Sequence, residues 1–185
     1  MHHAKPIVPI FFAVDDHYAP YLAVAMRSLI DNASPDHQYN IHILIDKLNE
    51  ENTVNLCGMA NDHVHVETVN VTSKLDELGD MLHLRDYYTK TTYYRFFIPA
   101  LFPQYDRGIY LDCDIVVKGD IAQLYKVPLG DNILAAAPEE VMRMVDVFGT
   151  YVEAVLEVPR NEYFSAGILV MNLEKMRRVA LEEQF

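Results

Sequence analysis

Positively charged residues are scarce in this sequence of 185 residues. It holds 15 Lys and Arg against 27 Asp and Glu, which gives a formal net charge of −12. Nucleic acids and anionic membrane surfaces both attract basic patches, so this balance argues against either as a partner. A phosphate-bearing ligand is still compatible with the sequence, because a bound cation can reverse the local electrostatic field.

Cysteine is also scarce, and long apolar runs are absent. The two cysteines, Cys57 and Cys113, do not form a C-x-x-C pair, so we predict neither a disulfide framework nor a zinc site. This usage is typical of a reducing compartment. No apolar run reaches the ~18 residues of a membrane span, and the N-terminus lacks the features of a signal peptide. We therefore expect a cytoplasmic protein without a transmembrane segment.

The pattern of apolar residues predicts a single α/β domain over residues 1–185. The sequence contains no repeat, no low-complexity segment and no linker, and its length is enough for one proper core. Apolar runs alternate with segments of helical spacing, so we expect a Rossmann-like, mixed but mainly parallel sheet flanked by helices. The predicted strands lie at 7–14, 41–45, 64–71, 109–111, 133–137 and after Gly167, and the predicted helices at 18–30, 50–60, 90–101, 139–156 and 174–185, with a loop of short helical pieces over 72–88.

Polar residues and prolines mark the predicted helix ends. The expected N-caps are Asp15 or Asp16 for the first helix, Asn49 for the second, and Thr91 or Thr92 for the helix over 90–101. Pro20 fits the first turn of the first helix. Pro99 or Pro103 is expected to end the helix over 90–101.

Two carboxylates follow the predicted strand at 109–111. Asp112 and Asp114 are separated by one residue, so they would point to the same side of an extended segment. Ligands in open α/β sheets bind at the carboxyl ends of strands, and two like charges there repel unless a cation lies between them. Mg²⁺ and Mn²⁺ take oxygen ligands and usually bring substrate phosphates. The pair therefore predicts a metal clamp for a phosphate-bearing substrate; the alternative is an ordinary turn, where Asp is common.

Three further groups have both a structural and a functional interpretation. Asp15 and Tyr18 follow the first strand, where they would bind a nucleotide base, or else cap a helix and fill the core. Arg95 lies in an apolar helix and would bind phosphate, or else pair with an acidic residue such as Asp106. The small residues at 165–167 would allow close approach of a ligand or form a tight turn.

Five stretches, in order along the chain, resemble the family 8 glycosyltransferases, which are retaining enzymes with nucleotide-sugar donors and the A-type glycosyltransferase fold. They are FFAVDDHYAPYLAVAMRSL (11–29), IHILID (41–46), TTYYRFFIPALFP (91–103), DRGIYLDCDIVVKGDIAQLY (106–125) and YFSAGILVMNLEKMR (163–177). The resemblance implies transfer of a hexose from UDP-glucose or UDP-galactose to a saccharide acceptor, such as that of lipopolysaccharide, with retention of configuration.

The resemblance also implies roles for residues near the D-x-D. Asp112 and Asp114 match the pair that binds Mn²⁺ (or Mg²⁺) and, through it, the donor pyrophosphate. The metal would offset the charge that develops on the departing UDP. Arg95 matches an arginine near the donor sugar and phosphates, and Cys113 lies where the backbone approaches the ribose. No residue is assigned as a catalytic nucleophile.

A second set of positions matches the part of the family that holds the base. Ala13, Val14 and Asp15 match positions that contact the uracil of UDP. Tyr18 matches the position that stacks on the base.

Three positions depart from the family's pattern. His17 stands where Asn is frequent, and Ser165 stands where the family usually has Asn, at a position that faces the sugar or acceptor region. Glu139 lies near the place of an Asp that often contacts the donor sugar. The resemblance thus places Ser165 and Glu139 in the acceptor or sugar region, with side chains that differ from those typical of the family.

The largest departure is length. The family continues with an Asp-bearing segment and later a His-x-x-Gly-x-x-Lys-Pro-Trp stretch, whose His is the third protein ligand of the metal. Neither stretch occurs here, and the sequence contains no Trp. We therefore expect an incomplete A-type fold, the donor-binding part of a longer enzyme, with weakened metal affinity.

Two other functions compete with the transferase. One is a catalytically incompetent fragment that binds a UDP-sugar without turnover, which the length of the sequence favours. The other is a phosphatase of the haloacid-dehalogenase type, because IYLDCDIVV fits its D-x-D-x-[T/V] loop. That loop usually follows the first strand, whereas three predicted strands precede it here.

Overall fold

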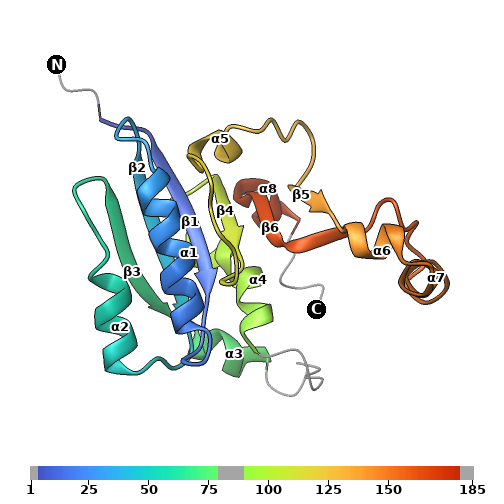
Figure 1. Ribbon diagram of the computed structural model, residues 1–185, viewed down its shortest axis with the longest axis horizontal. Helices are drawn as coiled ribbons and strands as arrows, with labels where there is room; N and C mark the ends of the chain where they lie inside the picture. The colour runs from blue at the N-terminus through green and yellow to red at the C-terminus, as the bar shows by residue number, and fades with distance from the viewer. Residues whose placement is uncertain (1–3, 79–89, 180–185) are drawn as a thin grey trace.

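The chain folds as a six-stranded sheet with helices on both faces (Figure 1). This computed structural model describes residues 4–78 and 90–179. Within these ranges the strands are β1 (Ile7–Ala13), β2 (Gln38–Ile45), β3 (Val64–Asn70), β4 (Arg107–Leu111), β5 (Leu134–Pro138) and β6 (Phe164–Asn172). The helices are α1 (Ala19–Asn32), α2 (Glu50–Cys57), α3 (Thr72–Leu78), α4 (Thr91–Leu101), α5 (Ala122–Tyr125), α6 (Glu140–Met144), α7 (Asp146–Val155) and α8 (Leu173–Arg178).

The sheet is mixed, and most of it is parallel. Its strand order is β3-β2-β1-β4-β6-β5. β1, β2, β3 and β4 all run in the same direction, whereas β6 runs antiparallel to its neighbours β4 and β5. The predicted Rossmann-like, mainly parallel sheet flanked by helices is therefore confirmed.

The proline inside β1 costs the sheet no ladder hydrogen bond. Gln38 N donates to Pro6 O at 2.9 Å, so the even-numbered residues of β1 direct their backbone groups toward β2. Pro9 is odd-numbered, and its missing N–H therefore faces β4, whose pairing with β1 begins one residue later. Pro9 is thus compatible with a central strand.

Alternation along the strands divides the core into two layers. Val8, Ile10 and Phe12 of β1 pack with the apolar faces of α1, α2 and α5 on one side of the sheet. Phe11 and Ala13 pack with α3, α4 and α8 on the other side. Because successive side chains of a strand point to opposite faces, a continuous apolar run is what a sheet covered on both faces requires.

The ends of the first two helices show how side chains fix the loops. The N-cap residue of α1 is Tyr18, so the prediction that Asp15 or Asp16 caps this helix is wrong. Pro20 does lie in the first turn, as predicted. Asp16 instead accepts a hydrogen bond from Asn49 N at 2.9 Å, which joins the loop after β1 to the start of α2. Asn49 caps α2 as predicted, and its side chain accepts from the backbone N–H of Asn52.

α4 ends at Leu101, two residues before Pro103, which agrees with the Pro103 alternative, but its predicted cap is wrong. It begins after Lys90 without a side-chain cap, so neither Thr91 nor Thr92 caps it. Pro99 lies inside the helix rather than ending it, and Phe102 N still donates to Ile98 O at 3.1 Å. One face of α4 is buried against the sheet, and this packing offsets the local cost of the proline.

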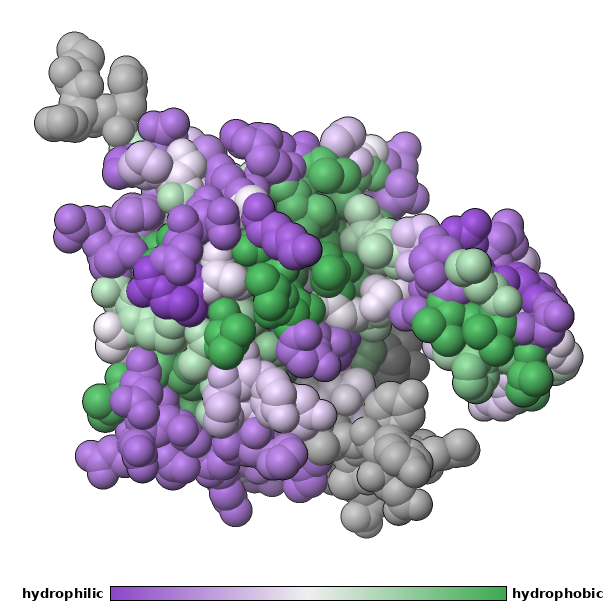
Figure 2. Space-filling model, in the orientation of Figure 1, coloured by the Kyte–Doolittle hydropathy of each residue, from purple (hydrophilic) through white to green (hydrophobic). Residues whose placement is uncertain are grey.

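A helical arm, residues 139–163, separates β5 from β6 and stands out from the sheet (Figure 1). The single helix predicted over 139–156 is broken at Val145 into α6 and α7. Several large apolar side chains of the arm are exposed, among them Met144 and Val147 (Figure 2). β6 begins at Phe164, so residues 165–167 are part of a strand and the alternative of a tight turn is wrong.

Parts of two predictions lie outside the described residues, namely 79–88 of the loop and 180–185 of the last helix. In the part of the chain that is described, no helix is long and apolar enough to cross a membrane.

Candidate active site

One pocket brings together all eight residues that the sequence placed around a nucleotide sugar. It lies at the carboxyl ends of β1 and β4 and also takes residues from the starts of α1 and α4. Its lining consists of Ala13, Val14, Asp15, Tyr18, Thr91, Thr92, Arg95, Tyr110, Asp112, Cys113 and Asp114. These two strands are parallel neighbours, so their carboxyl ends lie at the same edge of the sheet, where open α/β folds bind ligands.

Cys113 joins the two strand ends. Its thiol donates a hydrogen bond to Ala13 O, with Sγ and O 3.1 Å apart. Burial, together with the negative charges of Asp112 and Asp114, raises the pKa of Cys113 to about 12. The thiol therefore stays protonated near neutral pH, where it acts as a donor and not as a nucleophile.

The two aspartates of the D-x-D have different surroundings. β4 ends at Leu111, and although Asp112 N still donates to Gly167 O at 2.8 Å, the chain bends at Cys113 and Asp114, so the prediction that the whole D-x-D lies on one extended segment is wrong. Asp112 is half-buried beside α4 and β6, whereas Asp114 is exposed. Both still line the same pocket.

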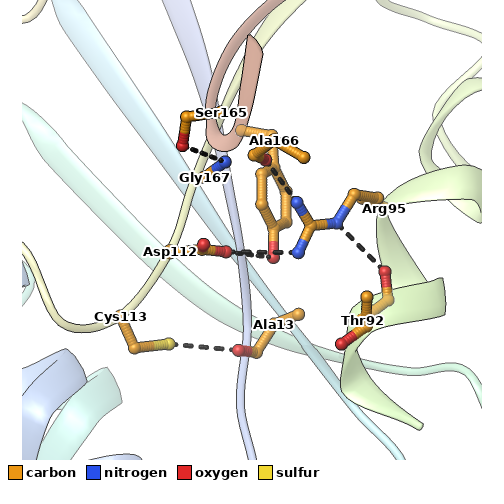
Figure 3. A network of polar contacts seen from close by, with 9 residues as sticks. Ala13, Thr92, Arg95, Asp112, Cys113, Ser165, Ala166 and Gly167 are labelled. Carbon is orange, nitrogen blue, oxygen red and sulfur yellow. Dashed lines mark hydrogen bonds and ion pairs between the residues drawn. The ribbon is translucent and has the colours of Figure 1, made fainter. Parts of the chain in front are cut away.

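Arg95 connects three elements at the floor of this pocket (Figure 3). Its Nε donates to Thr92 O at 3.0 Å, Nη1 donates to Ala166 O in β6, and Nη2 donates to Asp112 Oδ1 at 3.2 Å. The structural alternative, a pair with an acidic residue, is found with Asp112 and not with Asp106, which pairs with Arg177 at 3.5 Å. A buried arginine needs such partners, and Arg95 is 9% exposed.

Tyr110 is a site residue that sequence reasoning missed. Its hydroxyl donates to Asp112 Oδ1 at 3.0 Å, and the Arg95 guanidinium carbon lies 4.3 Å from its ring centroid. Burial raises the pKa of Tyr110 well above its usual range, so the hydroxyl remains a donor. The signal was available, because residues at i and i+2 of a strand point to the same face.

Thr91 and Thr92 were also missed as pocket residues. The sequence suggested only a capping role for them, yet both line the pocket. The first turn of α4 thus forms one wall, opposite the D-x-D.

Two positions that the sequence predicts to contact a base lie in the turn between β1 and α1. Asp15 Oδ1 accepts a hydrogen bond from Tyr18 N at 3.0 Å, which holds the turn between β1 and α1. The Tyr18 side chain is 42% exposed at the rim of the pocket. An exposed aromatic ring can stack on the face of a planar ligand group, and a carboxylate beside the ring can accept a hydrogen bond from an N–H of that same group.

Ser165 and Glu139 do not line this pocket. Ser165 Oγ accepts a hydrogen bond from Gly167 N at 3.4 Å. Ser165 directly precedes Ala166, whose carbonyl oxygen accepts from Arg95. Glu139 is a helix cap, and its carboxylate accepts from Val141 N at 3.3 Å.

The charges of the pocket favour a cation. Among the described residues, Asp15, Asp112 and Asp114 contribute three negative charges and Arg95 one positive charge, which leaves a formal excess of two negative charges on this part of the lining. Within residues 4–78 and 90–179, no cluster of three or more His, Cys, Asp or Glu side chains could hold a metal ion. Two carboxylates nevertheless fit Mg²⁺ or Mn²⁺, which are usually bound through one or two carboxylates plus substrate phosphates.

Comparison with known proteins decides the family. The model of glycosyl transferase family 8 matches residues 9–185 of the chain. The chain belongs to glycosyl transferase family 8. This membership confirms the family resemblance, and it decides against the phosphatase alternative.

Individual relatives agree with family 8 membership. GlyE, a glycosyltransferase of Streptococcus pneumoniae, is 28% identical over 174 residues, which are 90% of this chain and 36% of that protein. The structure is similar to the bifunctional glycosyltransferase WbbM, with a TM-score of 0.79, 30% identity, and coverage of 97% of this chain and 34% of WbbM. It is also similar to the galactosyltransferase LgtC, solved with donor and acceptor sugar analogues, with a TM-score of 0.72, 29% identity, and coverage of 92% and 60%.

These similarities show the A-type glycosyltransferase fold of family 8. The chain spans 49% and 60% of the length of two further relatives, from Haemophilus influenzae and Bacillus subtilis. It therefore corresponds to about half of those proteins.

Proposed function

We propose that this family 8 chain takes part in transfer of a hexose, glucose or galactose, from a UDP-sugar to a saccharide acceptor, with retention of configuration and dependence on a divalent metal. The observation that carries the proposal is the pocket that gathers all eight residues that the family resemblance assigned to the nucleotide sugar. They come from four segments of the chain and meet at the edge of the sheet where nucleotides bind in open α/β folds.

Asp112 and Asp114 would hold the cation, which is Mn²⁺ or Mg²⁺. The excess negative charge of the pocket would otherwise repel a diphosphate. When bound, the metal supplies positive charge that offsets the charge developing on the departing UDP. Arg95 contributes a positively charged side chain to the described part of the lining, and its guanidinium lies beside Asp112, where it would contact the donor phosphates or sugar.

The other end of the pocket suits the nucleoside. Asp15 uses one carboxylate oxygen to hold Tyr18 N, which leaves the second oxygen to accept an N–H of uracil. Tyr18 offers its exposed ring to the face of the base. The backbones of Ala13 and Val14 would run beside the base, and that of Cys113 beside the ribose.

The acceptor side is proposed on contacts around β6. Arg95 holds Ala166 O, which places neighbouring Ser165 next to the D-x-D. Glu139 begins the arm that leads back to this strand. These two residues would face the sugar or the acceptor, which we propose to be a saccharide such as that of lipopolysaccharide.

A second candidate is a chain that binds the UDP-sugar without turning it over. One observation favours it. The described residues offer the metal two carboxylates without a third side-chain ligand.

Calorimetric titration with UDP, with and without Mn²⁺, tests both candidates. We expect Mn²⁺-dependent binding that Asp114→Ala abolishes, because this change removes one of the two carboxylates. Asp62→Ala is the matched control, since Asp62 is an exposed aspartate just before β3, at the opposite edge of the sheet. Absence of UDP binding by the unaltered chain under both conditions would contradict the nucleotide site. Release of free hexose from UDP-glucose or UDP-galactose would separate the enzyme from the binding fragment.

A further inference from the structure

The two oxygens of the Asp112 carboxylate are treated differently by the protein. Oδ1 accepts hydrogen bonds from Tyr110 Oη at 3.0 Å and from Arg95 Nη2 at 3.2 Å. No hydrogen bond from any described residue reaches Oδ2, although the side chain is only 40% exposed. One oxygen is therefore occupied by the protein, and the other is left for a ligand.

Gly167 makes room for the second oxygen. A Cβ atom at this position would lie 2.5 Å from Asp112 Oδ2, a contact that real Cβ atoms do not make. The backbone of Asp112 also donates to Gly167 O at 2.8 Å, which extends the pairing of β4 with β6 by one residue. Because this pairing fixes the separation of the two backbones, Asp112 can relieve the contact only by rotating its side chain, which would disturb the hydrogen bonds of Oδ1 with Tyr110 and Arg95.

The Tyr110 side chain has two separable roles: its hydroxyl orients the Asp112 carboxylate, and its ring packs in the core. The ring is 2% exposed and lies beneath the Arg95 guanidinium. Its hydroxyl bonds to the carboxylate that follows two residues later. Replacement by phenylalanine removes the hydroxyl alone and keeps the ring.

We propose that Tyr110 is a positioning residue which, with Arg95, holds Asp112 Oδ1 so that Asp112 binds the cation through Oδ2 alone, in a space that Gly167 keeps open. The inference rests on the metal-dependent donor site proposed above. It goes beyond that site by assigning Asp112 a single-oxygen mode of binding and by naming the two residues that impose it.

Single-oxygen binding has a consequence for metal selectivity. Mg²⁺ binds six ligands in a tight octahedron and usually coordinates one oxygen of each carboxylate, whereas Ca²⁺ often coordinates both oxygens of a carboxylate. With Oδ1 held, Asp112 cannot offer both oxygens to a larger ion. We therefore expect the site to prefer Mn²⁺ and Mg²⁺ over Ca²⁺, and Tyr110 to contribute to that preference.

The test measures metal binding directly. Free Mn²⁺ is followed by electron paramagnetic resonance during titration of the chain in the presence of UDP, and Ca²⁺ affinity is obtained by competition. The variants are Tyr110→Phe and Gly167→Ala. The controls are Tyr21→Phe, at an exposed tyrosine of α1 that does not line the pocket, and Gly119→Ala, where an added Cβ would meet nothing within 4 Å. Thermal melting of each variant reports whether it is folded.

Removal of a residue that orients a metal ligand typically costs about 10-fold to 100-fold in affinity. We expect Tyr110→Phe to weaken Mn²⁺ binding by about tenfold and Ca²⁺ binding less, so that the Mn²⁺/Ca²⁺ preference falls. Gly167→Ala is expected to weaken Mn²⁺ binding at least as much, while both controls bind as the unaltered chain does.

Three results would overturn the inference. Unchanged Mn²⁺ affinity in a folded Tyr110→Phe chain would show that the hydroxyl does not position Asp112. Equal losses for Mn²⁺ and Ca²⁺ would contradict the single-oxygen mode. If the unaltered chain binds UDP but no Mn²⁺, the metal dependence in the proposed function fails, and the inference fails with it.

Discussion

Removal of the Arg95 side chain is the sharpest test of how the pocket is held together. Arg95→Ala deletes the bonds to Thr92 O, Ala166 O and Asp112 Oδ1 in one step. The change thus disconnects α4 from the D-x-D and from the start of β6. It also leaves the Asp112 carboxylate without its positively charged partner.

The expected loss follows from the exposure of the two partners. Breaking a fully buried ion pair by removing one partner costs about 3 to 5 kcal/mol, whereas exposed pairs contribute at most about 1 kcal/mol. The Arg95 side chain is 11% exposed but that of Asp112 is 40% exposed, so water recovers part of the cost. We expect the free energy of unfolding to fall by about 2 to 3 kcal/mol, because the case lies between these limits.

Urea unfolding followed by circular dichroism measures this difference. The melting temperature should fall as well, by roughly 5 to 10 °C for a chain of this size. Arg143→Ala is the control, since Arg143 forms an exposed pair with Glu140 on α6 and should cost less than about 0.5 kcal/mol. If Arg95→Ala is no less stable than Arg143→Ala, Arg95 does not hold these elements together.

Two further predictions concern the sheet. Gly108→Ala should destabilise the fold by about 1 to 3 kcal/mol in urea unfolding, because its Cβ would lie 2.4 Å from a ring carbon of Phe11, whereas Gly119→Ala should change stability by less than about 0.5 kcal/mol; similar values for both would refute the packing argument. His42 is buried, and burial lowers its pKa below the ordinary value of 6.5, although Glu67 accepts from the ring and opposes the shift. The unfolded chain then binds the proton first, so stability is complete above about pH 6.5 and is lost as pH falls toward the lowered pKa, by at most about 1.4 kcal/mol per pH unit. His42→Gln should reduce this slope in urea unfolding between about pH 7.5 and about pH 5.5, and an unchanged slope would exclude His42 as its source.

The sequence predicted the parallel half of the sheet well, because each strand there is a continuous apolar run. Strand boundaries were less predictable where pairing and not composition decides them. β2 begins at Gln38, three residues before its apolar run, because Gln38 N donates to Pro6 O beside it. The local pattern of apolar residues carries no information about such a contact between strands.

The candidate site shows the same division. Asp15, Arg95, Asp112 and Asp114 could be selected from the sequence, because charged residues beside apolar strands and helices need an explanation. The arrangement of these residues relative to one another could not be predicted from the sequence. Arg95 pairs with Asp112 and not with Asp106 because β6 enters the sheet antiparallel to β4 and brings Ala166 to the guanidinium. Periodicity says nothing about which strands will be neighbours.

Helix caps were less predictable than the helices themselves, and α4 gives the physical reason. Thr91 and Thr92 favour capping positions and Pro99 favours a helix end, yet Lys90 is the N-cap residue and the helix continues through Pro99 to Leu101. The buried face formed by Tyr94, Phe97 and Ile98 outweighs those preferences, since burial of large side chains contributes more free energy than a cap.

The position of the helical arm has a consequence for how such chains can diversify. The arm leaves the sheet at Pro138 and returns at its partner Phe164, three residues before Gly167. Insertions or deletions in this segment can therefore reshape the surroundings of the pocket while β4, β5 and β6 keep their pairing. The helical arm can thus vary in length and in amino-acid composition, while the strands that form the framework of the neighbouring pocket stay constant.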